Sequence, residues 1–172
     1  MPRRYPPALV VLHWLAAFLV LGSLLGGTFN MAEVPYTDPG KVATLRMHMI
    51  VGGLILLVML MRLVVRARKA VPAAVPGPGW QVAAARAVHL GLYAVTIGMA
   101  VSGVALALAS GLPGMVFGGA PLPESFDLFA PRAVHGALAS VLFVLVIVHV
   151  LAAFWHAGVK GDGILSRMWF GR

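Results

Sequence analysis

The chain contains no cysteine, and this absence removes several kinds of chemistry at once. Without thiols there is no disulfide, no cysteine-held iron–sulfur cluster, no thiolate metal site and no covalently attached c-type haem. Charge is also scarce, because charged residues make up only 10% of the 172 residues and only 5 of them are acidic. Hydrophobic residues account for 60%, and the mean hydropathy of +0.94 is too high for a water-soluble domain of this length.

Four long apolar runs take up most of the sequence. Each is long enough to cross a bilayer as a helix, and lipid offers no other partner for backbone polar groups. Connectors rich in glycine and proline separate the runs. We therefore expect one all-α domain over residues 1–172, an integral membrane four-helix bundle. Its predicted spans are approximately 8–29, 47–65, 87–109 and 134–156.

The distribution of basic residues predicts the orientation of these spans. The net charge of +8 could suggest nucleic acid, but the basic residues flank the apolar runs and form no patch, so we expect a lipid membrane and no nucleic acid. Ten basic residues fall on one side against three on the other, which places both termini in the cytoplasm. The ten are Arg3, Arg4, Arg62, Arg66, Arg68, Lys69, Arg86, Lys160, Arg167 and Arg172; the three are Lys41, Arg46 and Arg132.

The first run is predicted to remain in the mature protein. It contains His13, and no A-x-A-like site for signal-peptide cleavage follows it.

The last apolar run has three histidines along one stripe: His135, His149 and His156. At about 100° per residue, the step from His135 to His149 returns to within roughly 40° of the same helix face, and at ~1.5 Å per residue it covers about 21 Å of a ~30 Å hydrocarbon core. Ionisable side chains inside a membrane indicate function by default, and neutral imidazole is a common axial ligand of haem iron. Two ligands at two depths predict two stacked haems.

When the histidines are sorted by their predicted depth in the membrane, they fall into an outer and an inner layer. The outer layer contains only His48 and His135, so a bis-imidazole haem there has one possible pair. The inner layer has four candidates: His13, His89, His149 and His156. We favour His13 with His149 for the inner haem, and His89 is the alternative partner. His156 lies nearest the surface and is better placed to handle protons.

Three other interpretations remain. A single histidine in a membrane helix could equally well hydrogen-bond a neighbouring helix, but this explains four histidines that pair by depth poorly. Zinc would require three or four ligands per site, whereas the outer layer has two histidines. The chain could also be a haem-free structural or transport bundle.

Two arginines lie a few residues before the outer histidines. Arg46 and Arg132 could pair with haem propionates or attract a small anion to the outer surface, and the alternative is an interfacial arginine that snorkels to water.

The motifs resemble those of the bacterial cytochrome b561 family over essentially the whole chain. They are Leu12-His13-Trp14, Met61-Arg62-Leu63, the segment from His89 to Tyr93 and the His135 and His149 pair. Within the family, the chain is most similar to the small stand-alone form that acts as a superoxide oxidase.

This resemblance implies a dihaem b-type cytochrome of the bacterial inner membrane that oxidises periplasmic superoxide and passes the electrons to ubiquinone. By position, His13 and His149 match inner-haem ligands, His48 and His135 match outer-haem ligands, His156 lies beside the quinone site, and His89 matches no ligand. Arg46, Lys41 and Arg132 are the charges available to the outer superoxide mouth. The alternative is a haem-bearing anchor that relays electrons between a periplasmic redox partner and the quinone pool, and the chain could also form a homo-oligomer.

Overall fold

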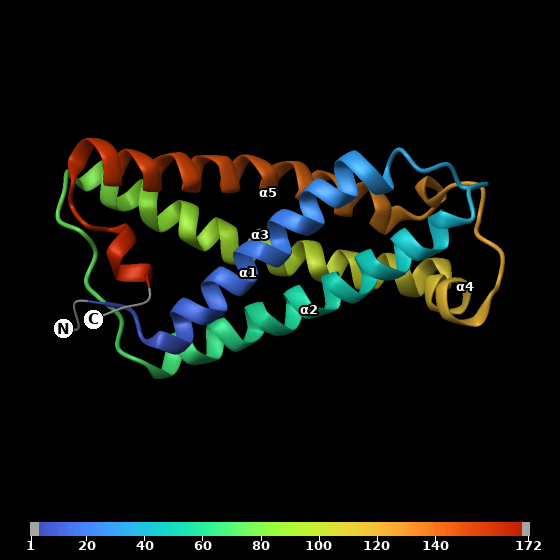
Figure 1. Cartoon of the computed structure of the whole chain (residues 1–172), viewed down its shortest axis with the longest axis horizontal. Coiled ribbons are helices and arrows are strands. Elements are labelled where there is room, and N and C mark those ends of the chain that lie inside the picture. The colour runs from blue at the N-terminus through green and yellow to red at the C-terminus, as the bar shows by residue number, and fades with distance from the viewer. Residues whose placement is uncertain (1–3, 170–172) are drawn as a thin grey trace.

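The computed structural model describes residues 4–169, which form an all-α bundle of four long helices (Figure 1). Arg3 and Arg172, which contributed to the predicted orientation, lie outside the described residues. The long helices are α1 (Pro7–Gly26), continued by the π-helical segment η1 (Gly27–Met31); α2 (Gly40–Arg68); α3 (Gly79–Ser110); and α5 (Ala130–Trp155), continued by the π-helical segment η3 (His156–Lys160). The shorter elements are α4 (Leu112–Gly118), η2 (Phe126–Leu128) and η4 (Leu165–Met168).

Proline and glycine set the ends of several helices. Pro7 and Pro131 occupy the first turns of α1 and α5, where the missing backbone N–H costs nothing. Gly111 ends α3 in the left-handed conformation, with φ of 71°, and its amide donates to the carbonyl of Ala107. The helices extend beyond the apolar runs because, near the membrane surface, water and head groups can satisfy polar side chains such as Arg86.

The four long helices run alternately up and down. α3 packs most extensively against α5, α1 packs along α2, and α2 also contacts α3. A core cluster in the middle of the bundle joins them, and its buried members are Leu12, Ala16, Val20, Leu24, Ile55, Val58, Met59 and Leu142. We call the end where α1 begins the inner end and the opposite end the outer end.

The short helix α4 closes the outer end (Figure 1). Val116 of α4 is fully buried, and Phe126 is 4% exposed against the same cluster, which includes Leu45 of α2 and Ala107 of α3. The segment between α3 and α5 is therefore packed onto the bundle, although the sequence indicated only a turn-rich connector.

The C-terminal segment folds back over the inner end. The amide of Tyr5 donates to the carbonyl of Arg167 at 3.2 Å, and the indole N–H of Trp14 donates to the carbonyl of Met168 at 2.7 Å. The Arg167 guanidinium donates to the carbonyl of Ala73. The start of α1 and the segment after α5 thus lie at the same end of the bundle.

The outward faces of the long helices are apolar. Phe18 is 75% exposed, and Leu108 and Phe154 are similarly accessible on other helices. Four of the helical stretches are long and apolar enough to cross a membrane. A bundle that exposes such side chains is stable in lipid and not in water, so this is a multi-pass membrane protein.

The predicted orientation can be tested because the chain has no cysteine of its own. Leu128 is 82% exposed at the outer end, and Ala74 is exposed in the connector at the inner end. In spheroplasts, a membrane-impermeant maleimide should label Leu128→Cys, and it should label Ala74→Cys only after lysis. The opposite labelling pattern would invert the orientation.

Candidate haem-binding site

Two facing pairs of histidines lie at two levels of the bundle. Near the outer end, the ring centroids of His48 on α2 and His135 on α5 are 6.1 Å apart. Nearer the inner end, those of His13 on α1 and His149 on α5 are 6.2 Å apart. The structure therefore brings together both pairs that the depth argument favoured.

The spacing of these rings matches two imidazoles bound to one metal ion. With metal–nitrogen bonds of about 2 Å and roughly 1.1 Å from each ring centre to its nitrogen, two axial imidazoles have centroids roughly 6 Å apart. Both pairs agree with this value. Among residues 4–169, no three histidine or acidic side chains gather as a metal-ion site, so the geometry suits paired ligands better than a zinc centre.

His89 of α3 lies beside the inner pair. Its ring centroid is 5.4 Å from that of His149, closer than two axial ligands of one metal require. By ring spacing, His89 is therefore less suited than His13 to share a metal ion with His149.

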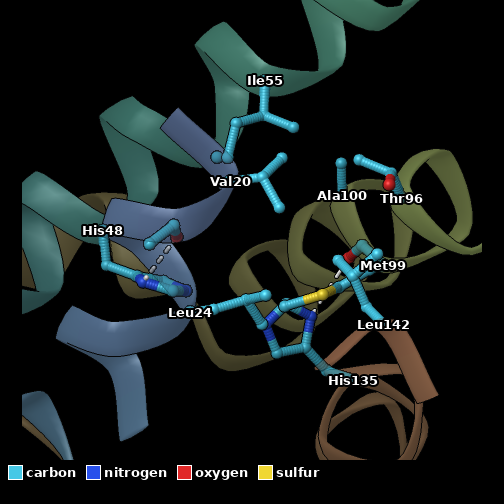
Figure 2. A pocket seen from close by; sticks show the side chains of 11 residues that line it. Val20, Leu24, His48, Ile55, Thr96, Met99, Ala100, His135 and Leu142 are labelled. Atoms are coloured by element: carbon cyan, nitrogen blue, oxygen red, sulfur yellow. Dashed lines mark hydrogen bonds between the residues drawn. The ribbon is translucent and has the colours of Figure 1, made fainter. Parts of the chain in front are cut away.

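The outer pair lines a cavity between the helices (Figure 2). Its empty volume, including the opening, is about 350 Å³, and small residues such as Gly52 and Ala100 form part of its wall. His48 enters from α2 and His135 from α5, as Figure 2 shows.

Hydrogen bonds orient the ring of His135. Its Nδ1 lies 3.0 Å from the Ser102 hydroxyl and 3.1 Å from the Met99 carbonyl, and Ser102 itself donates to that carbonyl. This network is satisfied when the ring proton is on Nδ1, which leaves Nε2 free as a ligand. The Nδ1 of His48 lies 3.4 Å from the hydroxyl of Ser23. The sequence did not single out these serines, because their role depends on how neighbouring helices are rotated.

The basic residues at the outer end are already engaged. Arg46 Nε donates to the Val116 carbonyl at 2.7 Å, and its guanidinium lies over the Phe117 ring. Arg132 Nε lies 3.6 Å from a carboxylate oxygen of Asp127, in a solvent-exposed pair. Both arginines lie on the turn before their histidines.

The side chain of Lys41 is buried. Its ammonium donates to the carbonyls of Met31 and Val34, both at 2.7 Å. Lys41 therefore secures the connector between α1 and α2 and is the least accessible of the three outer cations.

His156 lies apart from the histidine pairs, at the inner end. Its Nδ1 is 2.5 Å from a carboxylate oxygen of Asp162, and the other oxygen of Asp162 accepts from the Ile164 amide. Burial alone would raise the pKa of Asp162, but these hydrogen bonds and the charges of His156 and Lys160 hold the pKa below its ordinary value. Asp162 therefore stays ionised at neutral pH and fixes a ring proton on Nδ1 of His156. In the sequence it was visible only as the single acid of the inner side.

Comparisons with known proteins show the family of the chain. Residues 4–171 match the family described as prokaryotic cytochrome b561. The chain is 30% identical to cytochrome b561 homolog 2 of Escherichia coli K12 over 97% of this chain and 92% of that protein. It is 28% identical to a probable superoxide oxidase, CybB, of Yersinia pestis, over 98% and 97% of the two chains.

The match covers both histidine pairs and all four apolar helices. Proteins of this family are membrane cytochromes that bind b-type haem and transfer electrons, and the paired imidazoles suit that cofactor. The chain belongs to the prokaryotic cytochrome b561 family.

Proposed function

We propose that this protein is a dihaem superoxide oxidase of the bacterial inner membrane. Two superoxide ions would each lose one electron at the outer end and leave as dioxygen, and one ubiquinone would gain two electrons and two protons at the inner end. One observation carries the proposal: the structure has two pairs of neighbouring imidazoles. The ring centroids within the pairs are 6.1 and 6.2 Å apart, and the two pairs are separated along α5 by about 21 Å. The similarity to a probable superoxide oxidase supports the choice of donor.

The four ligands of this proposal are His48 and His135 for the outer haem and His13 and His149 for the inner haem. Bound haem would supply the reversible one-electron chemistry of iron that electron transfer from superoxide to quinone needs. The protein's part is to hold and orient the imidazoles. The hydrogen bonds from His135 to Met99 and Ser102 are of the type that fixes a ligand's tautomer.

At the outer end, Arg46 and Arg132 are the proposed superoxide mouth. Superoxide is a small anion, so a locally positive opening increases its rate of encounter. Arg132 keeps 44% of its side chain exposed even while it pairs with Asp127, and the guanidinium of Arg46 lies between α2 and α4. A weak, exposed ion pair is readily exchanged for another anion.

At the inner end, His156 is the proposed quinone-site residue. It is about 10 Å further toward the cytoplasm than His149 and roughly 20° from the same face. Its Nδ1 is held by Asp162, so its Nε2 is the atom that can exchange a proton with water and with a quinone oxygen. Asp162 is the positioning residue of this pair.

A second function is favoured by the apolar outer surface. Leu128 and Phe117 are 82% and 60% exposed on the segment that closes the outer end. Such residues suit the docking of a periplasmic redox partner, in which case the protein would relay that partner's electrons to quinone. If the purified protein oxidises superoxide without a partner, the superoxide oxidase function is favoured over the relay.

The assignment of the haem ligands predicts different haem contents for the His13 and His89 variants. Wild-type protein should contain about two non-covalent b haems per chain by pyridine haemochrome assay. His13→Ala should lose the inner haem, because it removes an iron bond, and His89→Ala should retain both haems. About one haem per wild-type chain would overturn the dihaem scheme. If only the His89 variant loses haem, then His89 and not His13 is the ligand of the inner haem.

The ring of His135 also depends on a glycine. A Cβ at Gly103 would lie 3.1 Å from Cε1 of His135, which is too close, whereas a Cβ at Gly98 of the same helix would be 3.7 Å from Leu138. Gly103→Ala should therefore displace the imidazole and alter the outer haem's absorption band and midpoint potential. Gly98→Ala is the matched control and should leave both unchanged; identical spectra for the two variants would contradict this role.

The function itself is tested by mixing purified protein with superoxide, with and without ubiquinone. We expect fast haem reduction by superoxide and reoxidation by quinone. His156→Ala should keep both haems and their fast reduction but slow the reoxidation by quinone, because a proton donor is lost. If superoxide does not reduce the haems, it is not the electron donor. If the variant reduces quinone as fast as wild type, His156 does not have the proposed role.

A further inference from the structure

Arg62 of α2 is a half-buried cation at the level of the inner histidines. Its Nε is buried and has no hydrogen-bond partner, while its guanidinium carbon lies 5.2 Å from the ring centre of Tyr93. Its charge is close enough to act on His13, His89 and His149. A buried donor without a partner needs an explanation, above all when it belongs to a charged side chain inside a membrane protein.

Among the described residues, 4–169, no carboxylate pairs with this arginine. Across residues 4–169, the ion pairs are Arg132 with Asp127 and His156 with Asp162. Asp162 is the only acidic residue at the inner end of the bundle, and it is already engaged. Tyr93 offers an aromatic ring and a phenol oxygen, which partly stabilise the cation and do not neutralise it.

The position of Arg62 repeats the spacing of the histidines on α5. Arg62 follows His48 by fourteen residues, as His149 follows His135. The same step of about 21 Å and roughly 40° therefore takes α2 from the outer layer to the inner layer on one helix face. α5 presents an imidazole at both layers, whereas α2 presents an imidazole at the outer layer and a guanidinium at the inner layer.

We infer that Arg62 binds a propionate carboxylate of the inner haem. A guanidinium presents its N–H groups in a planar fork that matches a carboxylate, and a haem between His13 and His149 brings two such carboxylates to this layer. The propionate would supply both the missing acceptor for Nε and the missing negative charge. A neutral quinone oxygen would supply only the acceptor. This inference rests on the proposed inner haem site.

The test compares Arg62→Gln with Arg66→Gln in purified protein. Arg66 is an exposed arginine one turn further along α2, so its variant removes the same charge without the buried contact. The readouts are the rate of haem transfer to apomyoglobin and the propionate bending band in resonance Raman spectra. Retention of the outer haem shows that each variant is folded.

We expect Arg62→Gln to release the inner haem about tenfold faster or more, which corresponds to the loss of a hydrogen bond to a charged group. It should also shift the inner haem's propionate band, and Arg62→Lys should restore part of both effects. Arg66→Gln should behave as wild type. Equal behaviour of Arg62→Gln and wild type, in protein that holds two haems, would overturn the inference alone. Wild-type protein with a single haem would instead overturn the proposed function.

Discussion

A helix that crosses lipid must satisfy all of its backbone hydrogen bonds within itself, and this constraint organises the whole molecule. Because the rise and the turn per residue are then fixed, the distance between two residues in the sequence becomes a depth and a direction in the membrane. The spacing of His135 and His149 on α5 is set in this way. α1 and α2 need only bring one imidazole each to the matching level.

The electrostatics of the bundle follow from the same constraint. The hydrocarbon core of a bilayer offers no hydrogen-bond partners, so a polar group at membrane depth needs one within the protein or its cofactor. His135 finds Met99 and Ser102 on α3, and Lys41 finds the carbonyls of Met31 and Val34. Arg62 Nε is the buried polar side-chain atom that finds no partner within residues 4–169.

The sequence predicted the four helices and the levels of the histidines well, because both depend on composition and on the helical repeat alone. The grouping of His48 with His135 followed from depth, since no other histidine lies in the outer layer. The choice between His13 and His89 could not be made so firmly, because both reach the level of His149 and only helix packing separates their distances of 6.2 and 5.4 Å.

Other features depend on contacts that a repeat does not encode. The packing of α4 arises from a segment rich in glycine and proline, which reads as a connector until Val116 and Phe126 are seen buried in one cluster. The contact between His156 and Asp162 requires the chain to turn back after η3, where Gly161 and Gly163 adopt positive φ angles. Ser102 and Gly103 affect His135 through the rotation of α3 against α5, which sequence periodicity leaves undetermined.

Both histidine pairs include a residue of α5, which is synthesised after α1, α2 and α3. During biosynthesis, α1, α2 and α3 enter the membrane with His13, His48 and Arg62 still without their final partners. Neither proposed cofactor can gain its second axial bond until α5 has been inserted. Cofactor capture in this scheme therefore waits for α5, so a ribosome that stalls before α5 would release a product unable to hold either proposed haem by two histidines.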